Sequence, residues 1–191
     1  MALDRSYDDV PSDPRPERHL PSCASGAGST QERAEPAEPR TRTEYYQALC
    51  AADDATRVNE NARDRQTERS GWNAVDAEDR PDVDGIRVTP ERATHILDGD
   101  ETGGGHRHGT GRPGKTEFPA SWDDRKIIDS ILDVARRPSQ TPGYQEWNNR
   151  WVARGRRDDA EIVVIVTRDG CIWSGWPLPG GAGVVKNPEG T

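Results

Sequence analysis

The sequence predicts an α+β fold in the C-terminal half of the chain, and three observations support that prediction. Residues 121–138 (SWDDRKIIDSILDVARRP) place their apolar side chains on one helical face. Residues 160–177 contain an apolar run, an Asp-Gly pair typical of a tight turn, and a second apolar run, which together predict an antiparallel hairpin. No repeated βαβ units are visible, so a parallel sheet is not expected.

Composition divides the chain into three parts. Only 31% of the 191 residues are hydrophobic and 31% are charged, so part of the chain is too polar to build a core. Residues 1–43, rich in Pro, Glu, Arg, Ser and Ala, are expected to be a disordered leader. Residues 44–80 predict a loosely helical linker or arm, because they offer one short apolar face. Residues 81–191 are expected to form the folded domain.

Charge and cysteine content restrict the classes of function. Most of the net charge of −8 lies in the first 90 residues, which argues against non-specific nucleic-acid binding by the whole chain but permits a local basic groove. Three scattered cysteines are too few for a disulfide framework or a zinc ribbon. No apolar run approaches the ~20 residues of a membrane span, and the N-terminus lacks the apolar core of a signal peptide. We therefore predict no membrane insertion and find no readable export signal.

The folded region begins with a strand, a helix and a glycine-rich loop. DGIRVT (84–89) alternates like a short strand. A helix follows, with Thr89 able to cap it and Pro90 suited to its first position. Gly99 can end this helix. The glycine-rich stretch that follows, up to Gly114, is expected to be a loop.

A second helix and the hairpin complete the domain. Ser121 and Asp124 predict a capping box at the start of the second helix. Its buried face is expected to consist of Ile127, Ile128, Ile131, Leu132 and Ala135. Residues 139–159 predict a polar loop, and AEIVVIVT then begins the hairpin. The core is also expected to include Phe118, Trp122, Trp147 and Trp151.

Residues 94–119 concentrate titratable nitrogen atoms in a glycine-rich setting. The set consists of His95, His106, His108 and Lys115. Two chemistries use such a set. One is metal binding, with Asp98 or Asp100 as an oxygen ligand. The other is metal-free acid–base catalysis, in which one imidazole accepts a proton, a second donates one, and the lysine stabilises a developing phosphorane. The residue types alone leave both open.

Four separated motifs, in a fixed order, point to a family. They are HILDGD (95–100), GGGH (103–106), PGKTEFPASW (113–122) and GCIWSGWP (170–177). Together they resemble the bacterial EndoU-type ribonuclease domain, over roughly residues 85–188. This domain commonly forms the C-terminus of bacterial polymorphic and contact-dependent toxins. The resemblance implies two small antiparallel sheets with flanking helices, in a fold related to ribonuclease A.

The resemblance also implies an activity and partners. It implies an endoribonuclease that needs no cofactor and cleaves RNA to a 2′,3′-cyclic phosphate and a 5′-hydroxyl end. A toxin of this kind implies a cognate immunity protein that blocks the site. The resemblance further implies that the protein is a secreted or delivered effector that acts in the cytoplasm of a target cell.

The resemblance also implies which residues form the site, because each lies in one of the matching motifs. His95 and His106 match the two family histidines, and Lys115 matches the family lysine. On the last strand, Ser174 and Trp176 occupy the positions that the family usually fills with Thr and Tyr. Serine retains a hydroxyl, whereas tryptophan retains a stacking face but has no phenol.

The sequence leaves several alternatives open. His108 is the alternative to His106 as the reactive ring. Arg154 and Arg156, together with Arg150 and Arg157, predict a phosphate-binding patch, although a solvated loop is an equal interpretation. The alternative functions are a catalytically decayed RNA-binding or interaction module, marked by Trp176, and a zinc-dependent hydrolase.

Overall fold

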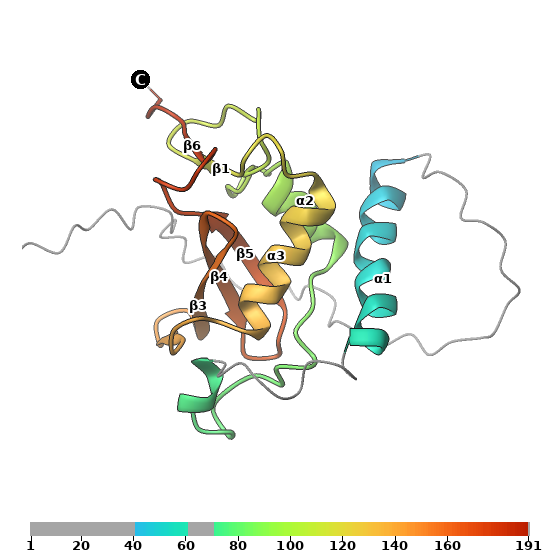
Figure 1. Cartoon of the computed structure of the whole chain (residues 1–191), viewed down its shortest axis with the longest axis vertical. Helices are drawn as coiled ribbons and strands as arrows, with labels where there is room; N and C mark the ends of the chain where they lie inside the picture. The colour runs from blue at the N-terminus through green and yellow to red at the C-terminus, as the bar shows by residue number, and fades with distance from the viewer. Residues whose placement is uncertain (1–40, 61–70, 191) are drawn as a thin grey trace, which may run out of the picture.

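The computed structural model describes residues 41–60 and 71–190. It has an α+β fold with two small antiparallel sheets and flanking helices, as the sequence predicts. In Figure 1, helix α3 lies across the larger sheet and helix α1 stands beside the rest of the domain. The predicted disordered leader lies almost wholly outside the described residues, and the proposed division of the chain at residues 43 and 80 stays a prediction.

The larger sheet has four antiparallel strands in the order β2-β3-β4-β5. These are β2 (Gly143–Gln145), β3 (Arg150–Arg157), β4 (Ala160–Thr167) and β5 (Ile172–Pro177). The predicted hairpin is therefore present as β4 and β5. The prediction of a polar loop over 139–159 is wrong, because β2 and β3 form there.

The sequence pattern did not predict strand β3, because arginines interrupt its apolar residues. Trp151 and Ala153 point into the core, while Arg150, Val152 and Arg154 alternate with them on the other face. An arginine can extend its aliphatic stem along a sheet and keep its charged end near solvent. A strand can therefore carry such residues on one face without losing its pairing.

The smaller sheet joins the C-terminal tail to the glycine-rich loop. It pairs β1 (Thr116–Glu117) with β6 (Val185–Lys186). The backbone N–H of Asn187 donates to the Lys115 carbonyl at 2.8 Å. The tail thus holds the segment that carries Lys115.

Both predicted helices form, with one difference at a cap. Helix α2 (Pro90–Leu97) is capped by Thr89, whose side chain accepts from the Arg92 N–H. Helix α3 (Asp124–Arg136) is capped by Asp123, which accepts from the Lys126 N–H at 2.7 Å. Ser121 is therefore not the cap, since a turn between Pro119 and Trp122 delays the start of the helix. The predicted strand over 84–89 is reduced to one isolated bridge between Arg87 and Cys171.

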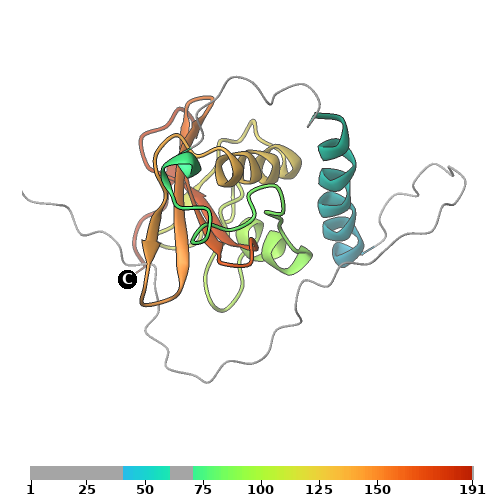
Figure 2. The same cartoon turned by 90° about the horizontal axis from the view of Figure 1, so that it is seen from below.

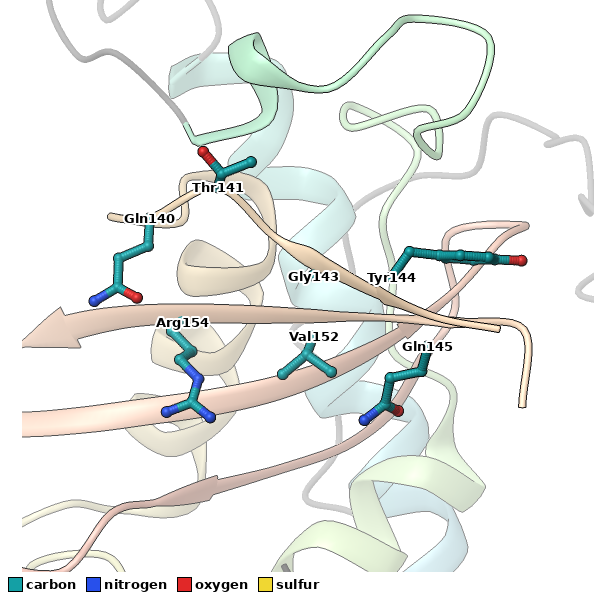
Figure 3. Close-up of a pocket in the computed structure, with 7 residues that line it drawn as sticks. All are labelled: Gln140, Thr141, Gly143, Tyr144, Gln145, Val152 and Arg154. Atoms are coloured by element: carbon teal, nitrogen blue, oxygen red, sulfur yellow. The ribbon is translucent and has the colours of Figure 1, made fainter. Parts of the chain in front are cut away.

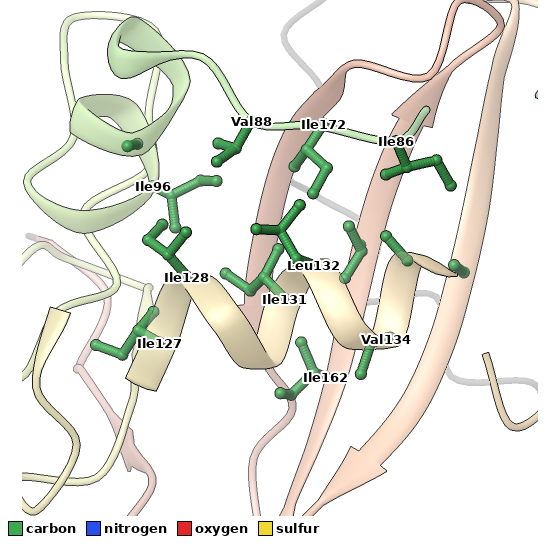
Figure 4. Close-up of a cluster of buried hydrophobic side chains, with 14 of the residues drawn as sticks. Ile86, Val88, Ile96, Ile127, Ile128, Ile131, Leu132, Val134, Ile162 and Ile172 are labelled. Carbon is green, nitrogen blue, oxygen red and sulfur yellow. The ribbon is translucent and has the colours of Figure 1, made fainter. Parts of the chain in front are cut away.

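The core lies between α3 and one face of the larger sheet, and Figure 4 shows its aliphatic part. The five predicted apolar residues of α3 are all buried, each with at most 1% of its surface exposed. Phe118, Trp122 and Trp151 are buried as predicted. Trp147 is not, because it lies in the turn between β2 and β3 with 63% of its surface exposed.

Helix α1 (Arg42–Glu60) packs beside α2 and α3, as Figures 1 and 2 show. Tyr46 is 1% exposed and Leu49 is buried with it. The Arg107 guanidinium links the three helices, because it donates to Tyr46, Asp98 and Asp124. Within the described ranges, no helix combines the length and the apolar character needed to cross a bilayer.

A short 3₁₀ helix, η1 (Gly71–Ala74), is the first element of the second described range. Trp72 is 1% exposed, and its indole N–H donates to the Ala135 carbonyl at 2.7 Å. Aromatic burial of this kind fixes the segment against the end of α3.

Candidate active site

His106 lies in the glycine-rich loop, held between α2 and β1. Its backbone N–H donates to the Ile96 carbonyl at 2.7 Å, and its carbonyl accepts from the Phe118 N–H at 2.8 Å. The residue is 2% exposed, and its Nδ1 lies 2.6 Å from the Thr116 carbonyl oxygen. Because a carbonyl can only accept, Nδ1 carries the proton, and Nε2 holds the lone pair of the neutral ring.

His95 occupies the last turn of α2 and is 6% exposed. Its Nδ1 lies 3.0 Å from Oδ2 of Asp100. Burial raises the pKa of Asp100, but hydrogen bonds from Thr102 and His95 outweigh it and lower that pKa to about 2. Asp100 is therefore a carboxylate throughout the neutral range. It orients the His95 ring through the contact at Nδ1.

Two consecutive glycines bring His95 and Lys115 to the same loop. Gly104 has a φ of +72°, and a Cβ placed there would lie 3.1 Å from Cδ2 of His95 and 2.0 Å from its carbonyl oxygen. A Cβ placed at Gly103 would lie 3.8 Å from Nζ of Lys115. The loop backbone can approach both groups only because these positions have no side chain. The structure thus brings the three predicted catalytic residues together around residues 103–106.

Strand β5 supplies the polar and aromatic side chains predicted next to them. Ser174 and Trp176 are two residues apart and face away from α3, opposite Ile165 and Val163 of β4. The rings of Trp176 and His106 are stacked, with centroids 6.2 Å apart. Strand β5 therefore places a large π-face beside the buried histidine, and a hydroxyl two residues before it on the same face of the sheet.

Glu117 is a structural residue of the site that the sequence did not reveal. It is 2% exposed and accepts from the backbone N–H groups of Gly109 and Gly111, at 2.6 Å each, and from Asn187 at 2.9 Å. Burial raises its pKa, but these hydrogen bonds outweigh that effect and lower it. The carboxylate thus fixes the far half of the glycine-rich loop. The only signal in the sequence was that this acidic residue directly precedes Phe118, which is predicted to lie in the core.

His108 lies apart from this arrangement. Its side chain is 44% exposed, and its Nδ1 is 3.9 Å from Oε2 of Glu117. It therefore faces the structural carboxylate at the loop surface. His106, in contrast, faces the interior and Trp176.

Arg154 and Arg156, two of the four arginines predicted to bind phosphate, occupy different surroundings. Arg154 lines a surface pocket beside β2, together with Tyr144 and Val152 (Figure 3). None of the three predicted catalytic residues lines that pocket. Arg156 is exposed and pairs with Asp159 at 3.3 Å. In the sheet, Arg154 lies opposite Val163, which itself lies opposite Trp176, so all three share one row.

The structure does not assemble the metal site considered from the sequence. Asp98 accepts from Arg107 at 2.5 Å and also contacts Tyr46, so it belongs to the network that joins the helices. Among the described residues, no group of three or more His, Cys, Asp and Glu side chains is placed to hold a metal ion. Asp100, the other candidate ligand, instead partners His95.

The chemical capacity of the site follows from these contacts. Each histidine has its Nδ1 held by an oxygen acceptor, so each neutral ring presents Nε2 as the basic nitrogen. An ammonium group lies beside the same loop. The site can therefore accept a proton, donate a proton and stabilise negative charge, in an α+β scaffold whose last strand adds a stacking surface.

Comparison with protein families gives one match, which covers part of the chain. Residues 103–179 match the family model of the bacterial EndoU nuclease. This part of the chain is therefore similar to a bacterial EndoU nuclease domain, which confirms the resemblance seen in the sequence. The matched residues include His106, Lys115, Ser174 and Trp176, whereas His95 precedes them. No curated protein and no solved structure matches the chain significantly.

Proposed function

We propose that the domain is a metal-independent endoribonuclease that cleaves RNA by transesterification. The RNA 2′-hydroxyl attacks the adjacent phosphorus atom while the bond from phosphorus to the 5′-oxygen breaks. One histidine takes the proton of the 2′-hydroxyl, and the other gives a proton to the departing 5′-oxygen. The products are a 2′,3′-cyclic phosphate and a 5′-hydroxyl end, and no external reactant is needed.

The observation that supports this proposal best is the matched anchoring of the two histidines. The Nδ1 atoms of His95 and His106 both face oxygen acceptors, which leaves the same nitrogen of each ring for proton transfer. Base-and-acid catalysis needs this pair, with one ring neutral and the other charged. Lys115 is assigned to stabilise the phosphorane, and Ser174 and Trp176 to position the substrate.

Cleavage of defined RNA tests the mechanism. A single 2′-O-methyl group at the scissile position removes the attacking hydroxyl, so cleavage should stop there and continue elsewhere. EDTA should leave the rate intact, and activity should follow a bell in pH. Cleavage of the methylated position at an unchanged rate would refute the transesterification mechanism.

Variants of two neighbouring histidines test the residue roles. His106→Ala should lower cleavage by ~10²-fold or more, the scale of lost acid–base catalysis. His95→Ala and Lys115→Ala should cost comparable amounts. His108→Ala is the matched control on the same loop, and it should cost much less, because that ring faces Glu117 at the surface. The opposite order of His106 and His108 would reverse the assignment.

The substitution at Trp176 supports a second candidate, a catalytically inactive RNA-binding or interaction module. Trp176 has no phenolic hydroxyl where the family usually has a tyrosine, yet it stacks on His106. The two candidates differ in one measurement. An inactive module would bind RNA equally well before and after His106→Ala and would cut it in neither case.

The biological role that we propose is that of a toxin. The family resemblance implies an effector that reaches the cytoplasm of a target cell, together with a cognate immunity protein that covers the site. Expression in a bacterial host tests this. The wild-type chain should arrest growth, and His106→Ala should not.

A further inference from the structure

Strand β5 contains a bulge that places an additional aromatic side chain on the outer face of the larger sheet, the face opposite α3. Ser174 pairs with Ile165, whereas Ile172 pairs with Val166, so the register shifts between them. Trp173 is the extra residue. Its side chain packs with the outer-face cluster that also includes Trp176. Bulges re-aim side chains in this way and occur often beside active sites.

Two guanidinium groups enclose the Trp173 ring. The Cζ atom of Arg92, on α2, lies 3.5 Å from the ring centroid, and that of Arg150, on β3, lies 3.6 Å from it. Two carbon atoms this close to one centroid must lie on opposite faces of the ring, because on one face they would overlap. Arg92, Trp173 and Arg150 therefore form an arginine–tryptophan–arginine stack.

The positive charge of this stack is poorly compensated. In the part of the chain that the structure describes, neither guanidinium donates a hydrogen bond or forms an ion pair, although both are half-buried. Burial, and then the charge of Arg92, lowers the pKa of Arg150 to about 10. Burial also lowers the pKa of Arg92, and Asp100 and Glu91 only partly oppose that effect. An anion would supply the missing partner for both groups.

Three relations connect the stack to the residues of the candidate active site. Arg92 precedes His95 by three residues on α2, so the two share one face of that helix. Trp173 immediately precedes Ser174 on β5. The Asp100 carboxylate, which holds His95, also interacts electrostatically with Arg92. A chain bound at the histidines and continuing along β5 would therefore meet the stack.

We propose that Arg92, Trp173 and Arg150 bind a backbone phosphate of RNA that flanks the scissile one. This subsite rests on the proposed ribonuclease function. Guanidinium groups match phosphate oxygens through paired N–H donors, and partial burial strengthens such contacts. The indole ring between them keeps both groups in place without neutralising them. RNA fits better than a separate anion because it carries a further phosphate at each nucleotide next to the one at the histidines.

A scan of phosphate charge tests the proposal. The substrate is a short oligodeoxynucleotide with one ribonucleotide, so that only one linkage can be cut. Each flanking phosphate in turn is replaced by a neutral methylphosphonate. With the wild-type chain, one position should lower kcat/KM by about 10- to 100-fold, the loss expected for charge-assisted hydrogen bonds.

Two arginine variants then identify the protein partner. Arg150→Gln should lower kcat/KM for the unmodified substrate by a similar factor, and neutralising the sensitive phosphate should then have little further effect. It should also reduce the slope of log binding constant against log salt concentration by about 0.7, the change for one lost contact to a single strand. Arg168→Gln, at an exposed position that pairs only loosely with Asp79, is the control and should behave like wild type.

The outcomes separate this proposal from the proposed function. If the wild-type chain leaves the ribonucleotide uncut, the ribonuclease function has failed. If it cuts, but no flanking phosphate matters, or Arg150→Gln keeps full sensitivity at the same position, the subsite is refuted. The same result is expected if the stack binds an acidic protein and not RNA. Should Arg150→Gln fail to fold, Arg150→Lys keeps the charge but loses the paired donors, and it should show a smaller loss at the same phosphate.

Discussion

Replacing Gly104 by alanine is the most direct test of how the loop positions the catalytic groups. A Cβ at this position would lie 2.0 Å from the His95 carbonyl oxygen, and the backbone there has a φ of +72°. The positive φ costs about 1–2 kcal/mol for a residue with a Cβ. The collision adds about 1–3 kcal/mol, the usual range for overpacking. We therefore expect a loss of about 2–5 kcal/mol in the free energy of unfolding.

The same collision predicts a loss of activity. Since real Cβ contacts are not closer than 3.0 Å, the loop or the end of α2 must move by about 1 Å, and a displacement of about that size can cost ~10²-fold in rate. Gly105 donates to the same His95 carbonyl at 3.0 Å, and His106 follows directly, so the shift reaches both histidines.

Gly111→Ala is the matched control. Its φ is +63°, and a Cβ there would have no atom within 4 Å, so it carries the strain of the positive φ without the collision. Urea unfolding and RNA cleavage, measured on both variants, separate the two effects. We expect Gly111→Ala to lose only about 1–2 kcal/mol and to retain its activity. Equal losses in the two variants would show that the contact with His95 does not position the site.

Two further predictions concern carboxylates. The pKa of Glu117 is lower in the folded protein than its unperturbed value of about 4.5, so its contribution to stability is present above about pH 4.5 and is lost as the pH falls through the lower folded value. Glu117→Gln should therefore lower the urea midpoint of unfolding at pH 7, and the midpoint of this variant should fall less in acid than that of the wild type. A fall in acid equal to that of the wild type would contradict this. Asp100→Ala removes the acceptor that orients the His95 ring, so RNA cleavage should fall, whereas Asp100→Asn keeps an oxygen at that position and should retain more activity; equal losses in the two variants would contradict an orienting role.

Local patterns in the sequence were sufficient for the elements whose side chains repeat with a clear period. The β4–β5 hairpin and the buried face of α3 could be predicted because apolar residues recur there at spacings of two or of three and four. The ordered motifs were sufficient to reveal the family resemblance and to select His95, His106 and Lys115 as candidates. Residue type and spacing, however, could not tell His106 from His108, or a metal ligand from a histidine partner at Asp100.

Those choices depend on contacts between segments that are far apart in the chain. The tail strand β6 and the Glu117 carboxylate fix the glycine-rich loop, and no local pattern announces either contact. Strand β3 was hidden because its outward arginines masked the alternation that its buried residues follow. The stack of Arg92, Trp173 and Arg150 joins three elements through a bulge in β5, which depends on the register between β4 and β5. Register and bulges follow from the packing of whole strands against the core, and for that reason only the tertiary structure decides them.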